Sequence, residues 1–253
     1  MLDLVNVWLR YGNGVLALQG VDLRLEAGEF VFLVGQTGSG KSSLLCLINR
    51  EVRPTSGEVW VDGQDVARLR AGHVPALRRK VGVVYQDFRL LPDRTIWENV
   101  AFALRVIGVG GRELSRRTEM ALDVVGLADR ARALPHQLSG GEQQRATIAR
   151  AIVNHPPILL ADEPTGNLDP DTSWEIIQLL NKINILGTTV LVASHDQMIV
   201  DRLQKRVVEL DHGTVVRDEA GGRYALQAVP TVRNSGQGRD PRLRVLDGLR
   251  YDP

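Results

Sequence analysis

The segment EFVFLVGQTGSGKSSLLCLI, residues 29–48, decides the fold of this chain. Its first six residues form a nearly continuous apolar run, which is typical of a parallel strand buried on both faces. The next nine residues, GQTGSGKSS (35–43), fit the phosphate-loop pattern G-x-x-x-x-G-K-[ST], and the apolar run SLLCLI (43–48) predicts a helix after them. A chance match is expected in about one chain in a hundred of average composition. The strand before the loop and the helix after it make a chance match less frequent still, so the segment predicts a phosphate-binding α/β core.

Each part of this loop has a chemical role toward a nucleoside triphosphate. The glycines allow the loop to fold back so that its N–H groups point at phosphate oxygens. Lys41 would neutralise the β- and γ-phosphates, the Ser42 hydroxyl would ligate Mg²⁺, and Ser43 would bond the α-phosphate. The residues of the loop predicted to bind ATP are Gly35, Gln36, Thr37, Gly38, Ser39, Gly40, Lys41, Ser42 and Ser43.

Two carboxylates end a second apolar strand, PILLADE (157–163). Open α/β sheets bind ligands at the carboxyl ends of their strands. Asp162 would hold Mg²⁺ directly or through water, and Glu163 would be the general base that orients the attacking water. Taken alone, an acidic pair at a strand end more often faces solvent. Beside a phosphate loop, the ligand-binding interpretation is favoured.

The stretch LSGGEQQRATIARAI (138–152) places a serine and two glycines directly before an expected helix. Glycine weakens a helix, so stability alone does not explain the pair. A helix N-terminus with free N–H groups suits an anion. The stretch therefore predicts an anion site, without telling whether the anion is bound by the same chain.

The remaining pattern alternates between strands and helices, with a helical stretch in the middle. We expect strands at 2–11, 21–26, 29–35, 58–63, 80–86, 157–163 and 188–194, a hairpin at 206–218, and helices at 95–106, 113–125, 142–154, 172–186 and 196–204. A helical insert over about 92–155 thus interrupts the α/β core of a domain that we place at 1–229.

The last residues, 230–253, are rich in Gly, Pro and Arg and show no periodicity, which predicts a flexible, weakly basic tail. A solvated appendage is the favoured interpretation, and a docking segment is the alternative. Contact with anionic lipid is a further hypothesis, because five arginines in the tail outnumber its three acids.

Composition excludes several other classes of protein. The 253 residues carry a formal net charge of +1, which does not favour nucleic acid as a partner. Cys46 is the only cysteine, so no internal disulfide is possible and a reducing compartment is expected. We expect neither a signal peptide nor a membrane span, because no suitable apolar run is present. Action at a membrane would therefore require another chain.

The phosphate loop, LSGGEQQ, ILLADE, NLD (167–169) and ASHD (193–196) occur in the order that resembles the ATP-binding subunits of ABC (ATP-binding cassette) proteins. The resemblance covers about residues 2–218. It implies a P-loop NTPase (RecA-like) α/β core with an N-terminal antiparallel β subdomain and a helical insert subdomain. It also implies ATP and Mg²⁺ as ligands and ATP hydrolysis as the activity.

The resemblance implies roles for further residues. Tyr11 would stack on adenine, although an edge-strand aromatic is an equal alternative. Gln86 would sense Mg²⁺, the attacking water and a membrane partner, and His195 would contact the γ-phosphate. Two chains would dimerise head to tail around ATP, with Asp169 at the interface. The residues that would face the partner's ATP are Ser139, Gly140, Gly141 and Glu142.

The other histidines and the tryptophans have simpler interpretations. No metal-ligand spacing groups the remaining histidines, so they are expected to be structural or solvated: His73, His136, His155 and His212. The tryptophans are interpreted most simply as packing residues: Trp8, Trp60, Trp97 and Trp174.

Three stretches narrow the choice within the family, namely REVRPTSG (50–57), VYQDFRLLPDRTIWENVAFALRVIG (84–108) and DEPTGNLD (162–169). They resemble the ATPase subunits that act in bacterial cell division with a membrane subunit and control cell-wall hydrolases. The alternative is the ATPase of a lipoprotein-release or macrolide exporter. Trp97, Trp174, Ser194 and the length of the tail depart from the usual pattern.

The resemblance places the chain at the cytoplasmic face of the cell membrane, attached through its partner. Phe88, Leu90 and Leu91, beside Gln86, are the expected docking cluster, and local packing under the insert is the alternative. A soluble ABC ATPase of DNA repair or translation is disfavoured, because the chain has one phosphate loop and no heptad run. A scaffold without turnover is disfavoured because Lys41, Glu163 and His195 are all present.

Overall fold

The computed structural model describes residues 1–224, and the predicted tail at 230–253 lies outside the described residues. A six-stranded sheet forms the centre of the molecule, in the order β10-β9-β3-β8-β7-β6. Its strands are β3 (Phe30–Val34), β6 (Val81–Val84), β7 (Ile158–Asp162), β8 (Thr189–Ala193), β9 (Arg206–Asp211) and β10 (Thr214–Glu219). All neighbours pair in parallel except β9 and β10, which form an antiparallel hairpin. The predicted α/β class is confirmed.

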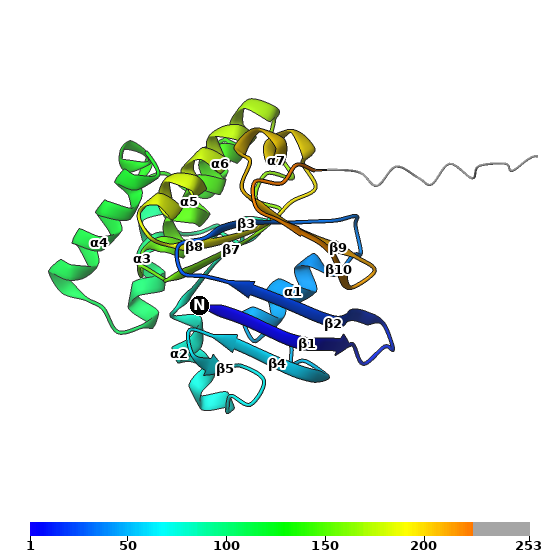
Figure 1. Ribbon diagram of the computed structural model, residues 1–253. Coiled ribbons are helices and arrows are strands. Elements are labelled where there is room, and N and C mark those ends of the chain that lie inside the picture. The colour runs from blue at the N-terminus through cyan, green and yellow to red at the C-terminus, as the bar shows by residue number, and fades with distance from the viewer. Residues whose placement is uncertain (225–253) are drawn as a thin grey trace, which may run out of the picture.

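A second, four-stranded antiparallel sheet lies beside the first, in the order β2-β1-β4-β5 (Figure 1). Its strands are β1 (Leu2–Arg10), β2 (Leu16–Leu25), β4 (Ser56–Val61) and β5 (Gln64–Asp65). Strand β2 begins at Leu16, five residues before the expected start. Gly20, at a φ of 61°, interrupts the alternation of apolar residues where the pairing of β1 and β2 shifts register, which hid the first half of the strand.

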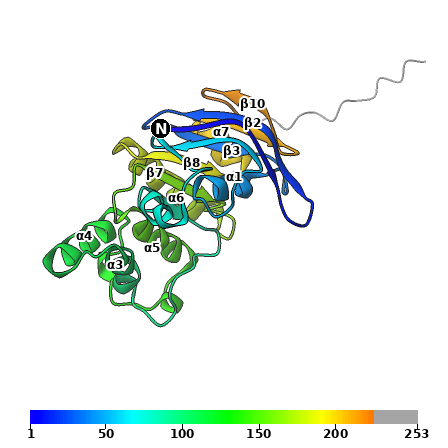
Figure 2. The same ribbon diagram turned by 90° about the horizontal axis from the view of Figure 1, so that it is seen from below.

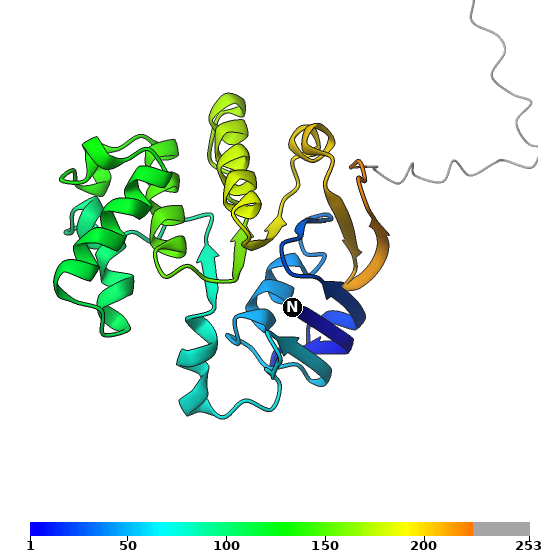
Figure 3. The same cartoon turned by 60° about the vertical axis from the view of Figure 1, so that its left-hand side comes forward.

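Helices cover the central sheet and form the insert. Those next to the core are α1 (Lys41–Ile48), α2 (Val74–Arg78), α6 (Pro170–Ile185) and α7 (Gln197–Leu203). Those of the middle of the chain are α3 (Ile96–Val106), α4 (Gly111–Val124) and α5 (Gly140–Ile152). Figures 2 and 3 show these three helices grouped together at the β6 and β7 side of the molecule. Helix α2 was not predicted, because five residues are too few for a helical period.

The buried residues divide into two clusters on opposite faces of the central sheet. All of β3 is buried, and its side chains alternate between the two faces. Phe30, Phe32 and Val34 contact the cluster that includes the helices of the insert and α6. Val31 and Leu33 contact the cluster shared with α1 and the antiparallel sheet. Strand β3 therefore joins both halves of the interior at the point where the phosphate loop begins.

The tryptophans differ in how deeply they are buried. Trp97 and Trp174 are partly buried against the cluster on the insert side. Trp8 and Trp60 lie on the antiparallel sheet and are each 37% exposed, so they pack at the surface and not in a core cluster. Their indole N–H groups bond nearby acceptors, Asn6 Oδ1 and Glu58 Oε2.

A fully buried asparagine orders the loop that follows β6. The side-chain oxygen of Asn99 accepts from Leu91 N at 2.7 Å. Its amide nitrogen lies 3.1, 3.0 and 3.0 Å from the carbonyl oxygens of Leu91, Arg94 and Thr95. One side chain on α3 thus holds the backbone of residues 91–95 and shapes the loop after Gln86.

Truncating this side chain is expected to destabilise the protein. Asn99→Ala removes the partner of Leu91 N and of Arg94 O and one of two donors to the carbonyls of Leu91 and Thr95, so we expect a loss of roughly 2–4 kcal/mol in the free energy of unfolding. Urea denaturation followed by circular dichroism measures it. Asn13→Ala is the control, because Asn13 makes only an exposed bond to Val15 N, and its loss should stay below about 0.5 kcal/mol. Equal losses for both variants would contradict the ordering role.

Candidate functional site

The phosphate loop leaves β3 and enters α1 through a backbone that only glycine can adopt. Gly35 has a φ of 142° and Gly40 a φ of 109°. A Cβ at Gly35 would lie 2.2 Å from Leu210 O, and one at Gly40 would lie 2.7 Å from Ala17 O. Both distances are far below van der Waals contact, so a side chain at either position would displace the loop. The first N–H groups of α1 have no partners within the helix and are available to an anion.

Lys41 lies across the loop. Its side chain is buried, at 7% exposure, and its ammonium lies 3.9 Å from Glu163 Oε1. The ammonium donates to Gly35 O at 2.8 Å and to Gln36 O at 3.1 Å. These carbonyls and the carboxylate keep the cation at the mouth of the loop, where it would meet phosphate oxygens.

Ser42 and Asp162 form a pair of oxygens suited to a hard cation. Ser42 Oγ donates to Asp162 Oδ1 at 3.1 Å, which joins the start of α1 to the end of β7. Burial raises the pKa of Asp162, and the bond from Ser42 partly offsets this. Among the described residues no group of three or more His, Cys, Asp or Glu could hold a metal ion by itself. Two neighbouring oxygen ligands fit Mg²⁺, which keeps waters and phosphate oxygens as its other ligands.

Glu163 occupies a strained position beside this pair. Its φ is 48°, which is unusual for a residue with a side chain, and its N–H donates to Ala193 O at 3.0 Å. Its Oε2 lies 2.7 Å from Nδ1 of His195, which follows β8. Strained backbone is common at functional sites, and here it turns the carboxylate away from the strand toward the histidine and the lysine.

Gln86 lies two residues beyond β6, close to the loop that follows Glu163. A Cβ at Gly166 would lie 2.9 Å from Gln86 Nε2, and Asn167 Nδ2 donates to Gln86 O at 3.4 Å. The bond from Asn167 and the close approach of Gly166 connect the backbone around Gln86 to the loop that follows β7. Gln86 itself is exposed.

Tyr11 contacts the phosphate loop by its hydroxyl. The phenol donates to Ser43 Oγ at 3.1 Å, and the ring packs against the cluster that α1 shares with the antiparallel sheet. The residue is therefore more than an edge-strand aromatic, since it reaches the first turn of α1. Its stacking on adenine stays a prediction.

The helix that follows the glycine pair is capped, and it starts earlier than expected. Helix α5 begins at Gly140, so the glycines are its first two residues. Ser139 Oγ accepts from Glu142 N at 3.3 Å, and Glu142 Oε2 accepts from Ser139 N at 2.8 Å. This capping box, with Arg130 Nε at 3.1 Å from Glu142 Oε1, lowers the pKa of Glu142. The Glu142 carboxylate is thus held by its own chain.

One glycine of the pair is required by packing inside the chain. A Cβ at Gly141 would lie 2.4 Å from Thr172 Cγ2 on α6, whereas one at Gly140 would meet Leu168 Cδ2 at 3.2 Å. The close approach of α5 and α6 therefore explains why residue 141 is a glycine, and no ligand is needed for this explanation. Sequence reasoning did not find Thr172, because the contact joins residues 31 positions apart.

Asp169 also serves as a helix cap. Its carboxylate accepts from Thr172 N at 3.0 Å at the start of α6. The side chain of Thr172, and then its N–H group, lower the pKa of Asp169. Within residues 1–224, the hydrogen bonds of Ser139 and Asp169 end on α5 and α6 and none reaches the phosphate loop. The predicted residues thus form two groups, one around Lys41 and one at these helix starts.

A groove of about 560 Å³ separates the core from the insert beside Tyr85. Arg78 lines it from α2 and Arg79 from the position after α2, Phe102 and Val106 line it from α3, and Arg150 lines it from α5. No acidic residue lines this groove within residues 1–224. Arg150 was not found from the sequence. Its guanidinium donates to the carbonyls of Phe88 and Arg89 and so holds the loop of the expected docking cluster.

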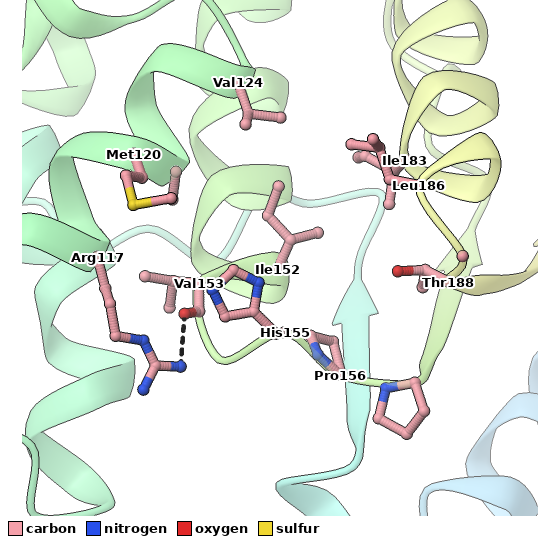
Figure 4. A pocket seen from close by; sticks show the side chains of 13 residues that line it. Arg117, Met120, Val124, Ile152, Val153, His155, Pro156, Ile183, Leu186 and Thr188 are labelled. Atoms are coloured by element: carbon pink, nitrogen blue, oxygen red, sulfur yellow. Dashed lines mark hydrogen bonds between the residues drawn. The ribbon is translucent and has the colours of Figure 1, made fainter.

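A further cavity, of about 440 Å³, lies between α4, the end of α5 and the end of α6 (Figure 4). Met120 and Val124 face Ile183 and Leu186 across it, and Arg117 donates to Val153 O at 3.0 Å. The cavity separates α4 from the end of α6, whereas α5 contacts both β6 and α6. Because Ser139 caps the start of α5, its position relative to the core is set by these contacts of α5.

Comparison with known proteins identifies the class. The family model described as ABC transporter matches residues 18–166, and the chain belongs to this family. The chain is 50% identical over 224 residues, 88% of its length and 98% of the relative, to the cell division ATP-binding protein FtsE of Bacillus subtilis. It is 51% identical over 227 residues to FtsE of Mycobacterium tuberculosis, covering 89% of this chain and 99% of that protein.

A solved structure agrees with this result. It is the dimeric structure of a post-hydrolysis state of the ATP-binding cassette MJ0796 bound to ADP and Pi. The two chains superpose with a TM-score of 0.80 and are 39% identical in sequence. The match covers 88% of this chain and all of the MJ0796 chain. The chain is an ABC-type ATPase that binds ATP, as its motifs predicted. The predicted fold, with its P-loop core, is likewise confirmed.

The contact of α5 with α6 can be tested by a pair of substitutions. Gly141→Ala places a methyl group against Thr172 Cγ2, so we expect roughly 1–2 kcal/mol of destabilisation. In Thr172→Ser the obstructing methyl is absent, and adding Gly141→Ala should then be neutral or stabilising because alanine favours helix. Chemical denaturation of the four proteins measures the coupling. Identical effects of Gly141→Ala in both backgrounds would contradict the packing explanation.

Proposed function

We propose that this protein is the ATPase subunit of a bacterial cell-division complex, which dimerises on ATP and drives an FtsX-like membrane subunit that controls cell-wall hydrolysis. The observation that carries the ATPase chemistry is the cluster of Lys41, Ser42, Asp162, Glu163 and His195 at the carboxyl ends of β3, β7 and β8. The name of the relatives supports the cell-division role.

In the proposed reaction each residue of the cluster has one task. The phosphate loop and Lys41 bind the phosphates, with Tyr11 against the adenine. Ser42, Asp162 and Gln86 would hold Mg²⁺, which would supply charge neutralisation on the phosphate oxygens. Glu163 accepts a proton from the attacking water, and His195 orients that carboxylate through their 2.7 Å contact.

The second group of residues completes the site of another copy in this proposal. Ser139 is exposed at the start of α5, and its bonds leave its own phosphate loop untouched. A head-to-tail dimer would bring Ser139, Gly140 and Gly141, with the positive end of the helix dipole, to the γ-phosphate held by the partner copy. Asp169 would lie at the same interface. Glu142 would act there by capping α5.

A dimer of this kind predicts separable effects of two substitutions. Glu163→Gln should retain ATP affinity and lose turnover, because the near-isosteric amide cannot accept the proton. The persisting ATP should hold two copies together by mass action. Adding Ser139→Arg should prevent close approach while leaving the phosphate loop of the same chain intact. Size exclusion with light scattering should show a dimer for the single variant in ATP and a monomer for the double variant.

Two results would contradict this dimer. The first is a double variant that dimerises in ATP as well as Glu163→Gln alone, since Ser139 would then not reach the second copy. The second is rapid ATP turnover by Glu163→Gln, which would remove Glu163 as the base. Binding of ATP to both variants, measured separately, ensures that a monomer reflects lost dimerisation and not lost ligand.

The membrane partner would dock in the groove between α2, α3 and β6. Phe102 is 48% exposed and Val106 66% exposed at its edge, and Leu91 is 36% exposed on the neighbouring loop. Leu90 packs against the core cluster on the insert side. For this residue of the expected docking cluster, the structure agrees with the alternative of local packing under the insert. Exposed apolar side chains beside Arg78, Arg79 and Arg150 suit a partner helix that carries apolar and acidic residues.

No helix in residues 1–224 has the length and apolar character needed to cross the bilayer. We propose that docking through this groove attaches the protein to the cytoplasmic face of the membrane.

Docking is tested by placing a charge in the apolar part of this surface. Leu91→Glu and Phe102→Glu should each abolish co-purification with the FtsX-like subunit in a detergent pull-down, because an unpaired acid replaces buried apolar contact. Ile185→Glu is the matched control, since Ile185 is 74% exposed at the end of α6, away from this groove. Its co-purification should equal that of the unmodified chain. Unchanged capture of both test variants would contradict the docking site.

A further inference from the structure

The turn between β9 and β10, residues 211–213, lies directly on the phosphate loop. Gly213 N donates to Ser39 O, in the middle of the loop, at 2.9 Å. Leu210 O, just before the turn, lies only 2.2 Å from the position that a Cβ of Gly35 would take. The end of β9 and its turn therefore contact the loop at its first glycine and again at its middle.

Strand β2 of the antiparallel sheet fixes this turn in place. The backbone N–H of Gln19 donates to Gly213 O at 2.8 Å. The side-chain amide of Gln19 donates to His212 O at 2.7 Å, although the two residues lie 193 positions apart in the sequence. Both of these carbonyls of the turn are thus tied to β2, and the turn cannot shift relative to this strand without breaking the bonds.

Two glycines meet at one carbonyl of β2. A Cβ at Gly213 would lie 2.7 Å from Ala17 O, and a Cβ at Gly40 would lie 2.7 Å from the same oxygen. Gly213 also has a φ of 81°, a left-handed conformation that favours glycine. There is no room for a side chain at either glycine, and this close approach brings the Gly213 N–H within reach of Ser39 O.

The bond from Gly213 orients the peptide between Ser39 and Gly40. This peptide is trans, so its C=O and N–H groups point in opposite directions. Because Ser39 O points at the turn, the Gly40 N–H points away from the turn. Within residues 1–224 this N–H has no hydrogen-bond partner. A free N–H group of a phosphate loop is a ligand for a phosphate oxygen.

We propose that Gly213 is a positioning residue of the nucleotide site, whose N–H group holds the Ser39 carbonyl and thereby presents the Gly40 N–H to the phosphates. Gly213 acts through the phosphate loop and takes no part in the chemical step. The proposal rests on the nucleotide site of the proposed function and deepens it, because it gives the turn after β9 and strand β2 a part in nucleotide binding. Gln19 supports this role by holding the turn.

The test is a side chain at position 213 that tolerates the left-handed backbone. Asparagine is such a residue, so Gly213→Asn should fold while its Cβ crowds Ala17 O. Gly63→Asn is the matched control. Gly63 has a φ of 74° in the turn between β4 and β5, and it follows Asp62 at a φ of 47°, just as Gly213 follows His212 at a φ of 45°. A Cβ at Gly63 would meet no atom within 4 Å.

Gly213→Asn should displace the turn and break the bond to Ser39 O. We therefore expect its dissociation constant for ADP, measured by isothermal titration calorimetry, to rise roughly two- to ten-fold, the range of one hydrogen bond. The KM for ATP should rise in parallel with little change in kcat, because Glu163 and His195 keep their places. Gly63→Asn should bind ADP as the unmodified protein does. The melting temperatures of the two variants without nucleotide report the cost of each substitution to the fold.

Two results would overturn the proposal. One is an ADP dissociation constant of Gly213→Asn equal to that of Gly63→Asn, since a purely structural role would lower only the melting temperature. Should Gly213→Asn not fold, Gln19→Leu replaces it, because this change deletes only the bond from the side-chain amide to His212 O. An unchanged ADP dissociation constant in Gln19→Leu is then the second such result, whereas a rise supports the proposal.

The experiment separates this proposal from the proposed function. ADP binding depends on the phosphate loop and not on dimerisation, on Glu163 or on a membrane partner. Failure of the dimer or of the cell-division role would therefore leave the expected difference between Gly213→Asn and Gly63→Asn unaffected. Unmodified ADP affinity in Gly213→Asn would remove the positioning role and leave the proposed function in place.

Discussion

The burial of β3 on both faces is the constraint on which the rest of the structure depends. A strand whose five residues are all inaccessible to water needs an apolar layer above and below it, and the two core clusters supply these layers. The chain must then leave the sheet at Gly35, where Leu210 O leaves no space for a side chain. Backbone N–H groups are therefore the ligands presented at this edge of the sheet, which makes it a site for phosphate. The strand and the loop are one physical unit, because the same close packing that buries β3 also shapes the turn after it.

The neighbouring strands add the charged groups at the same edge. Parallel pairing of β3 with β8, and of β8 with β7, brings Lys41, Asp162, Glu163 and His195 together, although they span 155 positions of sequence. The lysine and the carboxylate share a largely buried environment, where charges interact more strongly than in water. The left-handed backbone at Glu163 is the conformational cost of turning a strand-end carboxylate toward His195. A strained backbone conformation is kept only where surrounding contacts hold it in place. The bond from Glu163 N to Ala193 O is one of these contacts.

Helix capping has a double use in this molecule. Ser139 and Asp169 each close the start of a helix in their own chain, and each lies in a motif that the proposed dimer would present to a second copy. The two uses are compatible, because a capped N-terminus keeps its dipole and some free N–H groups. The close approach of Gly141 to Thr172 places α5 against α6, so both helix starts are positioned by one packing contact. Changes in the orientation of α5 would consequently reach both motifs at once.

The sequence by itself determined the α/β class, the phosphate loop and the order of most elements, because apolar runs, glycines and proline pairs are local signals. It also predicted the carboxylate pair at the end of β7. It missed the first half of β2, where a bulge at Gly20 breaks the alternation, and it did not tell how exposed Trp8 and Trp60 are, because their exposure depends on what lies over the antiparallel sheet. The packing of the folded chain shows that Gly141 serves packing against Thr172 and that Arg150 holds the loop after Gln86. These contacts join residues 31 and about 60 positions apart, whose distance in space is set by the packing of whole helices, and no local pattern carries that information. The capping box of Ser139 and Glu142 does follow a local pattern, S-x-x-E, which the anion interpretation of the glycine pair left unused.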